Sequence, residues 1–378
     1  MLKIAIIGCG KIADAHASQI RRIKGCEIVG VCDRESLMAQ QIYERFPVKQ
    51  YFTEVPDLIN QSRPDIVHIT TPPESHFDLA KLCLDEGCNV YVEKPFTLYA
   101  DQAEQLVRLA NSKRLKLTVG HNDQFSHAAR RLRSLVEQGY LGERPIHLES
   151  YYGYDLGDPS YAKALLGDKH HWVRRLPGKL LQNVISHGIA KIAEFLRGDD
   201  PQVFVHGFAS ALLKGIGEDD IADELRVLIV DKDGTTAYFT FSSQMRPSIH
   251  EFRMYGSKNG LILDQDHETV LQLRGQKYKS YADRFIPPVV MAKQYLGNLK
   301  RNVKLFLNMD FHMDSGMKYL IESFYRSVRD DAPLPISYRE IVLTAKIMDS
   351  IFEQLNRSQL TDDSDVQAQT QKAALAAS

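Results

Sequence analysis

Cysteine is scarce in this chain, which holds five cysteines among 378 residues. No two of them form a Cys-x-x-Cys pair, so neither a disulfide framework nor a thiolate zinc site is indicated. All five precede residue 90 and are Cys9, Cys26, Cys32, Cys83 and Cys88. We expect the buried free thiols of a protein that works in a reducing cytoplasm, and we expect no metal site.

A surplus of charge of either sign is also missing. The chain holds 47 Lys and Arg against 48 Asp and Glu, with both signs interspersed. Nucleic-acid binders carry a basic face, so we exclude that class. No cleavable apolar leader precedes the first predicted strand, which again favours a cytoplasmic location. The length leaves room for two domains.

What the sequence does contain, at its very start, is an apolar run that ends in a glycine turn. The pattern Gly8-x-Gly10-x-x-Ala13 is typical of a strand, turn and helix that bind a dinucleotide. Gly8 permits the tight turn, Gly10 lets the backbone approach a pyrophosphate, and Ala13 lets the helix pack closely on the strand. The phosphates are expected at the first amides of that helix, which belong to Lys11 and Ile12.

A second apolar run ends at Asp33, about 20 residues past the turn, where dinucleotide sites place an acid. Asp33 therefore favours a cofactor site over an ordinary strand-to-helix turn. Its carboxylate accepts from a ribose 2′-hydroxyl and repels a 2′-phosphate, so NAD is the preferred cofactor. Arg34 is suited to pair with that phosphate, so NADP stays open as the alternative.

Predicted strands and helices alternate in the first part of the chain. Strands are expected over 65–70, 89–92 and 115–120, and helices over 35–46, 76–86 and 100–112. This alternation is typical of a doubly wound parallel sheet. We predict an α/β Rossmann domain over residues 1–122.

The pattern changes beyond residue 140, where strands dominate. They are expected over 146–154, 203–208, 224–230, 236–242 and 250–255, with a helix over 179–196. Asp233-Gly234 supplies a hairpin turn, so the sheet should be open and mainly antiparallel. We predict an α+β substrate and oligomerisation domain over 123–356. Residues 357–378 lack a buried face and should form a mobile tail.

Two loops follow strands at the edge where open parallel sheets bind ligands. The first runs from Thr71 and Pro72 to His76, and its prolines stiffen the backbone beside the expected cofactor. The second is Glu93-Lys94-Pro95, whose lysine is directed at the nicotinamide and the substrate. A solvated surface pair is the ordinary alternative for Glu93 and Lys94, but the strand-end position favours a function.

In the predicted helix 179–196, Asn183 and His187 are one turn apart and share a face, so both can reach into a cleft. A lone histidine near an apolar face is commonly structural, and that alternative stays open for His187.

Several motifs occur in one order along the chain. They are Gly8-Cys9-Gly10-Lys11-Ile12-Ala13, Thr71-Pro72-Pro73 with His76, Glu93-Lys94-Pro95, Val119-Gly120-His121-Asn122, and the helix that contains His187. Together they resemble the Gfo/Idh/MocA family of oxidoreductases, over residue 1 to about 260. The resemblance implies an NAD(P)-dependent enzyme that oxidises or reduces a hydroxyl-bearing or keto carbon of a sugar, cyclitol or nucleotide sugar. It also implies an open sheet that often mediates homo-oligomers.

The resemblance implies roles for particular residues. In that family the lysine of Glu-Lys-Pro and a helix histidine act at the substrate hydroxyl, which maps onto Lys94 and His187. Asn183 stands where an aspartate is common, and Ala190 where a second one often follows. An asparagine can bind a hydroxyl but cannot act as a base, so proton transfer must depend on His187. Gln124 stands near the place of a frequent loop arginine.

The predicted catalytic residues are thus Lys94, His187 and Asn183. The predicted cofactor contacts are Gly8, Gly10, Lys11, Ile12, Asp33, Arg34, Thr71, Pro72, His76, Glu93, Lys94 and Asn122. The predicted substrate contacts are Tyr154, His170, His171, Trp172, Arg174 and Arg175. The two arginines are suited to a carboxylate or phosphate, with a solvated basic surface as the alternative.

A dehydrogenase or ketoreductase is the leading interpretation. A sensor that binds NAD(H) without turnover is a second class, which the missing aspartate supports. A third class is an NAD-assisted glycoside elimination without net redox change.

Residues 284–309 form a basic and apolar segment without a single acid. Such a segment can lie on an anionic membrane as a peripheral contact. Packing against the second-domain sheet or a partner subunit is the commoner outcome and our preferred prediction.

Overall fold

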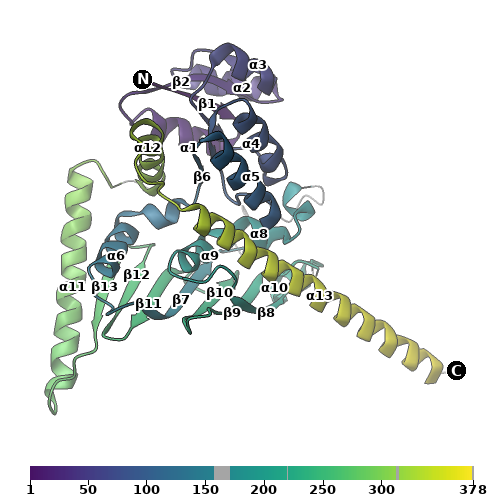
Figure 1. The fold of residues 1–378 in the computed structure, drawn as a ribbon. Coiled ribbons are helices and arrows are strands. Elements are labelled where there is room, and N and C mark those ends of the chain that lie inside the picture. Colours follow the sequence, from purple (N-terminus) through teal and green to yellow (C-terminus); the bar gives the residue numbers. More distant parts are fainter. Residues whose placement is uncertain (157–170, 219, 312–314, 377–378) are drawn as a thin grey trace.

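The structure, a computed structural model, describes residues 1–156, 171–218, 220–311 and 315–376, with side chains as far as Arg357. Two sheets form the cores of two domains, and helices of the C-terminal half pack between and beside them (Figure 1). None of the helices in the described part of the chain is both long and apolar enough to cross a bilayer.

Six parallel strands form the N-terminal sheet, in the order β3-β2-β1-β4-β5-β6. They are β1 Leu2–Ile7, β2 Cys26–Cys32, β3 Tyr51–Phe52, β4 Ile66–Ile69, β5 Asn89–Val92 and β6 Leu117–Val119. The accompanying helices are α1 Lys11–Ile20, α2 Ser36–Arg45, α3 Val55–Ser62, α4 His76–Asp85 and α5 Ala100–Lys113. The strand order reverses between β1 and β4, so their carboxyl ends open a crevice of the kind that binds ligands. The predicted Rossmann domain is confirmed.

Seven strands form the C-terminal sheet, in the order β13-β12-β11-β7-β10-β9-β8. They are β7 Pro145–Gly153, β8 Gln202–Phe208, β9 Glu224–Val230, β10 Thr236–Ser242, β11 His250–Gly256, β12 Asn259–Asp264 and β13 Thr269–Arg274. Neighbours are antiparallel except β7 and β10, which run parallel. The open, mainly antiparallel sheet is therefore confirmed, and β12 and β13 extend it beyond the predicted strands.

The helix predicted over 179–196 is wrong as a single element. The structure has two helices there, α8 Lys179–Val184 and α9 Ser186–Ala193, which meet at Ile185. At the break the Asn183 carbonyl accepts a hydrogen bond from Lys94 Nζ. A lysine from the N-terminal domain thus donates a hydrogen bond to a carbonyl near the end of α8. The local sequence pattern does not reveal this contact.

The last two long helices tie the domains together. α12, Ser315–Asp330, lies in the stretch predicted for the second domain, yet its Leu320, Ile321 and Phe324 are buried in the N-terminal core. α13, Tyr338–Ala376, contacts both α5 and α9 (Figure 1). Neither helix was among the elements predicted from the sequence.

Helix α13 extends as far as Ala376, so most of the predicted tail is helical in the structure. Residues 357–376 contain several Ala and Gln, which continue an existing helix at little cost even without a buried face. The mobility of this segment stays a prediction.

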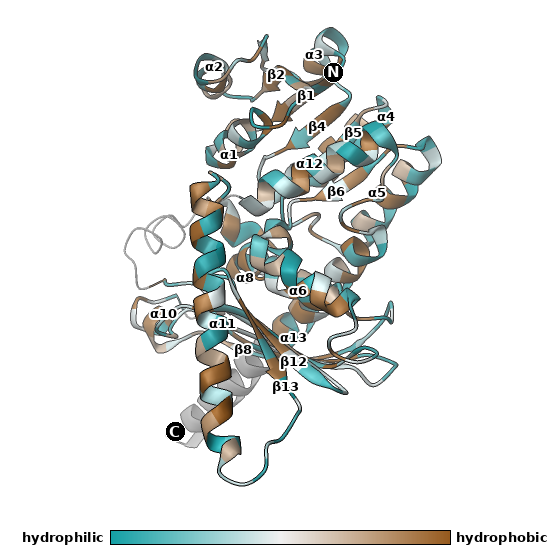
Figure 2. Ribbon diagram, turned by 90° about the vertical axis from the view of Figure 1, so that its left-hand side faces the viewer, coloured by the Kyte–Doolittle hydropathy of each residue, from teal (hydrophilic) through white to brown (hydrophobic). Residues whose placement is uncertain are grey.

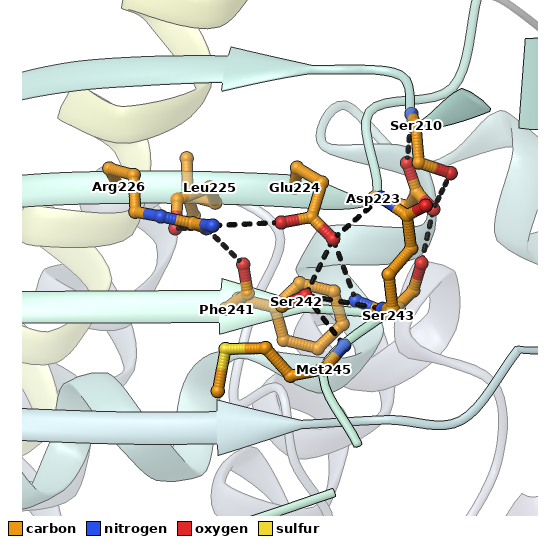
Figure 3. A network of polar contacts seen from close by, with 10 residues as sticks. Ser210, Asp223, Glu224, Leu225, Arg226, Phe241, Ser242, Ser243 and Met245 are labelled. Carbon is orange, nitrogen blue, oxygen red and sulfur yellow. Dashed lines mark hydrogen bonds and ion pairs between the residues drawn. The ribbon is translucent and has the colours of Figure 1, made fainter. Parts of the chain in front are cut away.

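A buried acidic pair fixes one end of the C-terminal sheet (Figure 3). Asp223 accepts hydrogen bonds from the amide and hydroxyl of Ser210 and from the Ser243 hydroxyl. Glu224 accepts hydrogen bonds from the Ser242 hydroxyl at 2.6 Å and from the Arg226 guanidinium at 2.9 Å. All four carboxylate oxygens therefore have donors within the protein, and we assign this network a structural role.

The five cysteines are unpaired thiols, and four of them are buried. Burial and nearby acids raise the pKa of Cys9 and of Cys32 to about 12. Reactive thiolates are thus disfavoured at these two positions.

Candidate active site

The glycine turn after β1 needs a glycine at its first position. Gly8 lies at φ +92°, and a Cβ there would come within 2.7 Å of Thr71 Cγ2. Its carbonyl accepts a hydrogen bond from Thr70 Oγ1 at 2.6 Å. Gly8 is therefore both in the left-handed region and pressed against the end of β4.

The second glycine of the turn faces open space. Gly10 is the N-cap of α1, and a Cβ built on it would meet no atom within 4 Å. The side chains of Lys11 and Ile12 are exposed beside it, while Ala13 is buried. The open approach to the first amides of α1 fits the pyrophosphate of a dinucleotide, so the residues present suit the predicted cofactor.

Asp33 follows β2 and turns its carboxylate to the same turn. The Cys9 amide donates to Asp33 Oδ2 at 2.7 Å, and the Glu35 amide donates to Oδ1 at 2.9 Å. Asp33 is partly exposed, and Arg34 beside it is exposed. The carboxylate therefore holds the turn and remains accessible at the predicted ribose position.

His76 joins the two loops that follow β4 and β5. Its Nδ1 lies 2.8 Å from the Pro95 carbonyl and its Nε2 lies 2.8 Å from the Thr71 carbonyl. The ring is fully buried, whereas Thr71 is partly exposed and Pro72 is exposed. His76 thus fixes the positions of both loops, and its own ring is covered.

Glu93 begins a buried chain of hydrogen bonds that sequence reasoning missed. Its Oε1 lies 2.8 Å from His16 Nε2, and His16 Nδ1 lies 2.8 Å from His68 Nδ1. His68 Nε2 lies 2.9 Å from the hydroxyl of Tyr325 in α12. The sequence does not reveal these contacts, because the residues that form them are up to 257 positions apart.

The chemistry of Glu93 sets the direction of the first hydrogen bond in this chain. Burial alone raises the pKa of Glu93, but the His16 hydrogen bond and the charge of Lys94 hold it below its ordinary value. A carboxylate only accepts, so His16 Nε2 donates to Glu93. Donor and acceptor in the two further hydrogen bonds depend on the tautomers of His16 and His68.

Lys94 follows Glu93 at the end of β5 and reaches the second domain. Its Nζ donates to the Asn183 carbonyl at 2.9 Å. Burial lowers the pKa of Lys94, while the charges of Glu93 and Asp123 oppose this shift. The structure thus brings the predicted residues Lys94 and Asn183 together, through the main chain of Asn183.

His187 faces an acid from the segment that follows β6. Its side chain is 11% exposed, and its Nδ1 lies 3.8 Å from Asp123 Oδ1. Burial lowers the pKa of His187, Asp123 raises it, and the cations Lys94 and Lys191 lower it. The net pKa lies below the ordinary value, so His187 is suited to accept a proton at neutral pH.

Asp123 is the main functional candidate that sequence reasoning missed. It belongs to η2, Asn122–Phe125, directly after β6. Burial alone raises the pKa of Asp123, but the charges of His187 and Lys191 hold it below its ordinary value. Its position next to Asn122 at the end of a strand could have indicated a functional residue. The pairing with His187 could not be predicted, because the two residues are far apart in the chain.

A third histidine lies close to this pair. The ring centroids of His121 and His187 are 5.9 Å apart. Burial, together with the charge of His187, lowers the pKa of His121 to about 3. His121 is therefore neutral at physiological pH and adds no positive charge beside His187.

Asp123 and His187 border a polar cavity of about 320 Å³ between the domains. Its wall consists of Asn122, Asp123, Ser126, Tyr152, His187, His250, Gln265, Asp266, Glu268, Gly316 and Met317. The volume suits a small ligand. Lys94 is not part of this wall, but its charge acts on both His187 and Asp123.

Lys191 approaches the cavity from α9. Its buried ammonium binds Gln265 Oε1 and lies 5.6 Å from the centroid of the Tyr152 ring. Burial lowers the pKa of Lys191, while Asp123 and Asp266 oppose the shift. This lysine was not among the predicted residues, although it follows Ala190 directly.

The predicted arginine pair binds protein carboxylates. Arg174 donates to Glu218 at 2.6 Å, and Arg175 donates to Glu74 at 2.8 Å. The second pair joins η3, Trp172–Arg175, to η1, Pro73–Ser75, across the two domains. Neither arginine lines the described cavity.

The other predicted substrate contacts lie in the same region. Tyr154 and Trp172 pack against the C-terminal core, and the ring centroid of His171 lies 5.4 Å from that of Trp172. None of the three lines the described cavity. His170 lies outside the residues that the structure describes.

Comparison with known proteins finds a family that is similar to the N-terminal domain. Residues 2–121 match the model of the Gfo/Idh/MocA family, described as an oxidoreductase family with an NAD-binding Rossmann fold. The D-glucoside 3-dehydrogenase of Escherichia coli is 30% identical over 143 residues, which cover 38% of this chain and 41% of that protein. The match thus spans less than half the length of this relative.

Two further similarities extend over both domains. The myo-inositol 2-dehydrogenase of Thermotoga maritima is 22% identical over 316 residues, which cover 79% of this chain and 88% of that protein. The WlbA dehydrogenase of Bordetella pertussis, solved with NADH and UDP-GlcNAcA, has a similar fold, with a TM-score of 0.74 at 15% identity over 94% and 96% of the two chains. The glycine turn and the Glu-Lys-Pro loop both lie within residues 2–121, so the N-terminal domain is similar to the NAD-binding Rossmann fold of the Gfo/Idh/MocA oxidoreductase family.

Proposed function

We propose that this protein is an NAD-dependent dehydrogenase that acts on a hydroxyl-bearing carbon of a sugar, cyclitol or nucleotide sugar. The observation that carries this proposal is the pairing of His187 with Asp123 in a polar cavity, beside Lys94 at the carboxyl edge of a Rossmann sheet. The open space in front of Gly10 supports a dinucleotide at the same edge.

His187 is the proposed general base. Its lowered pKa keeps the imidazole neutral at physiological pH, so it can take the proton of a substrate hydroxyl during oxidation. Asp123 then stabilises the imidazolium that forms. A nicotinamide bound at this edge of the sheet would supply the hydride acceptor for the same carbon, and reduction would reverse these roles.

Lys94 is the proposed stabiliser of the developing alkoxide. Its ammonium is anchored at the Asn183 carbonyl, which leaves the other two N–H donors for further partners. Glu93 precedes it in the chain, and the Lys94 amide donates a hydrogen bond to Glu93 Oε2 at 3.1 Å, which fixes the start of the loop. Asn183 thus contributes its main chain to the site.

NAD is the proposed cofactor, since Asp33 offers a carboxylate at the position that meets the ribose. Titration of NADH and NADPH, followed by nicotinamide fluorescence, compares the two dissociation constants. We expect tighter binding of NADH, and we expect Arg34→Ala to leave the NADH affinity unchanged. Tighter binding of NADPH that Arg34→Ala abolishes would reverse the assignment.

The substrate class rests on chemistry and on relatives. Hydrogen-bonding side chains dominate the cavity wall, as expected for a polyol. A D-glucoside 3-dehydrogenase and a myo-inositol 2-dehydrogenase are among the relatives, and WlbA was solved with a nucleotide sugar. Because Arg174 and Arg175 bind Glu218 and Glu74, the carboxylate or phosphate of a sugar acid or nucleotide would need another partner, for which Lys191 is the nearest candidate.

A homo-oligomer through the C-terminal sheet is also proposed. Large apolar side chains are exposed on one face of its strands β8 and β10, namely Phe204, Phe208 and Tyr238. A patch of this kind on a sheet face suits a second copy. Sedimentation of Phe204→Ser beside the unmodified protein tests this, with a smaller species as the expected result.

The function itself is tested by incubating the protein with NAD and a panel of sugars, cyclitols and nucleotide sugars while NADH is measured. One NADH formed for each oxidised substrate supports the proposal. Release of a sugar from a glycoside without net NADH would instead identify an elimination. Tight NADH binding with no turnover on any member of the panel would favour a sensor.

A further inference from the structure

Helix α11, Ala282–Leu307, seals the edge of the C-terminal sheet with amide side chains. Gln294 exchanges two hydrogen bonds with the backbone of Gln272 in β13, at 2.7 and 3.0 Å. Asn298 makes the same pair of contacts with the backbone of Val270, at 3.3 and 3.1 Å. The polar side of the helix therefore faces the protein and satisfies an edge strand.

Two further contacts hold the helix in this orientation. Asn302 Nδ2 donates to the His267 carbonyl at 2.9 Å, one turn beyond Asn298. Arg131 of α6, His127–Glu137, donates to Asn298 Oδ1 at 2.6 Å. Asn298 is the buried residue of α11, so its inner face is fixed by polar contacts and contributes little apolar burial.

The opposite face of α11 is apolar and exposed. Its side chains recur at alternating intervals of four and three residues, which places them in one stripe along the helix. The stripe consists of Phe285, Val289, Ala292, Leu296, Leu299, Val303 and Phe306. Phe285 is 70% exposed and Phe306 is 65% exposed. Brown, apolar residues lie between teal, polar ones along this helix in Figure 2.

Only cations accompany the stripe. Residues 284–309 include Arg284, Lys293, Lys300, Arg301 and Lys304, all of them exposed, and contain no Asp or Glu. Tyr281 and Tyr295, 73% and 53% exposed, add amphipathic rings of the kind that suit a lipid interface.

We propose that α11 is a docking surface for an anionic lipid membrane, on which the helix lies flat with its apolar stripe among the acyl chains. At about 1.5 Å for each residue, its 26 residues present an interfacial length of about 39 Å. Five exposed cations against the single acid Asp283 of the first turn give α11 a net positive charge, which complements acidic headgroups and opposes the pairing of two α11 helices face to face. This inference is independent of the proposed dehydrogenase activity.

Vesicle sedimentation with the full chain tests the proposal. The protein should sediment with vesicles of phosphatidylcholine and phosphatidylglycerol and remain in solution with vesicles of phosphatidylcholine alone. The double variant Leu296→Ser, Leu299→Ser should lose binding, whereas Ile216→Ser, which changes another exposed apolar residue at 56% exposure, should retain it.

Charge variants supply a second measure. Lys300→Gln and Lys304→Gln each remove one cation, and each substitution should weaken the apparent vesicle affinity about fivefold. Lys214→Gln, at an exposed lysine of the short helix α10, Ala211–Gly215, should have no effect. Equal sedimentation with both kinds of vesicle would overturn the proposal. The stripe would belong to a second copy of the chain if two results occurred together. The unmodified protein would bind no vesicles, and the variant Leu296→Ser, Leu299→Ser would change its oligomer size in the absence of lipid.

Discussion

His187 Nδ1 lies 3.8 Å from Asp123 Oδ1, so the acid beside the candidate catalytic histidine comes from η2, directly after the last strand of the N-terminal sheet. The family resemblance leads one to expect that acid one helical turn before the histidine, where this chain has Asn183. The carboxylate is therefore present on a different element. Because η2 follows β6, the histidine environment depends on how α9 packs against the end of the N-terminal sheet.

Removal of the candidate base tests its role. His187→Ala should lower the turnover number by about 100- to 10,000-fold, because general base help is typically worth this much. NADH affinity should be unchanged, since His187 lies in the cavity wall and the glycine turn is distant in the chain. A variant that retains nearly full turnover would remove His187 from the mechanism.

The charge of Asp123 sets the pH range in which His187 is neutral. Asp123 raises the pKa of His187 against the lowering effect of burial, so Asp123→Asn should lower that pKa further. Oxidation requires the neutral imidazole, and the acidic limb of the kcat/KM profile should therefore move to lower pH.

Asp266→Asn is the matched control for this experiment, because Asp266 also lines the cavity but is not among the charges that shift the pKa of His187. Its profile should keep the wild-type midpoint. A limb that moves to higher pH in Asp123→Asn would contradict the assigned electrostatics.

The two glycines of the turn should respond differently to the same change. Gly8→Ala forces a left-handed backbone and a contact with Thr71, so it should lower the free energy of unfolding by about 1–3 kcal/mol or more. Gly10→Ala meets open space and should change it by less than about 0.5 kcal/mol. Urea denaturation of both variants measures this, and equal losses would contradict the described turn.

The buried His68 should make stability depend on pH. Burial and the neighbouring His16 lower its pKa well below the ordinary value, so the unfolded chain binds more protons than the folded chain just below that value. The free energy of unfolding should therefore fall as the pH drops below about 6.5, by up to about 1.4 kcal/mol per pH unit for this group.

His68→Gln should show a shallower slope between about pH 7.5 and about pH 5.5, whatever its absolute stability. His206→Gln, at an exposed histidine of β8, is the control and should keep the wild-type slope. Identical slopes for the wild type and His68→Gln would show that His68 is not the titrating group.

Local patterns predicted the elements that carry the site but not the contacts between them. Lys94 and His187 were predicted because one ends a strand at the ligand edge and the other lies on a helix face. The bonds of Arg174 and Arg175 to residues 44 and 101 positions away are not encoded in any local pattern. The break between α8 and α9 at Ile185 is not encoded in a local pattern either, because Lys94 of the N-terminal domain binds the Asn183 carbonyl there.

The side of α11 that packs on the sheet was also beyond sequence reasoning. Apolar periodicity ordinarily marks the buried face of a helix, and the preferred prediction was packing of residues 284–309 on the second-domain sheet or a partner subunit. Packing of α11 on the sheet is confirmed. Amide side chains make this contact and the apolar stripe is exposed, because β13 offers unpaired backbone groups.

Titration of NADH into the unmodified protein and into Gly10→Ala, followed by nicotinamide fluorescence, tests the central claim most directly because it requires no knowledge of the substrate. The account predicts saturable binding to the unmodified protein and much weaker binding to the folded Gly10→Ala variant, whose new methyl group occupies the space in front of the α1 amides. If the unmodified protein binds neither NADH nor NADPH, the cavity beside Lys94 and His187 is not the site of a nicotinamide-dependent dehydrogenase.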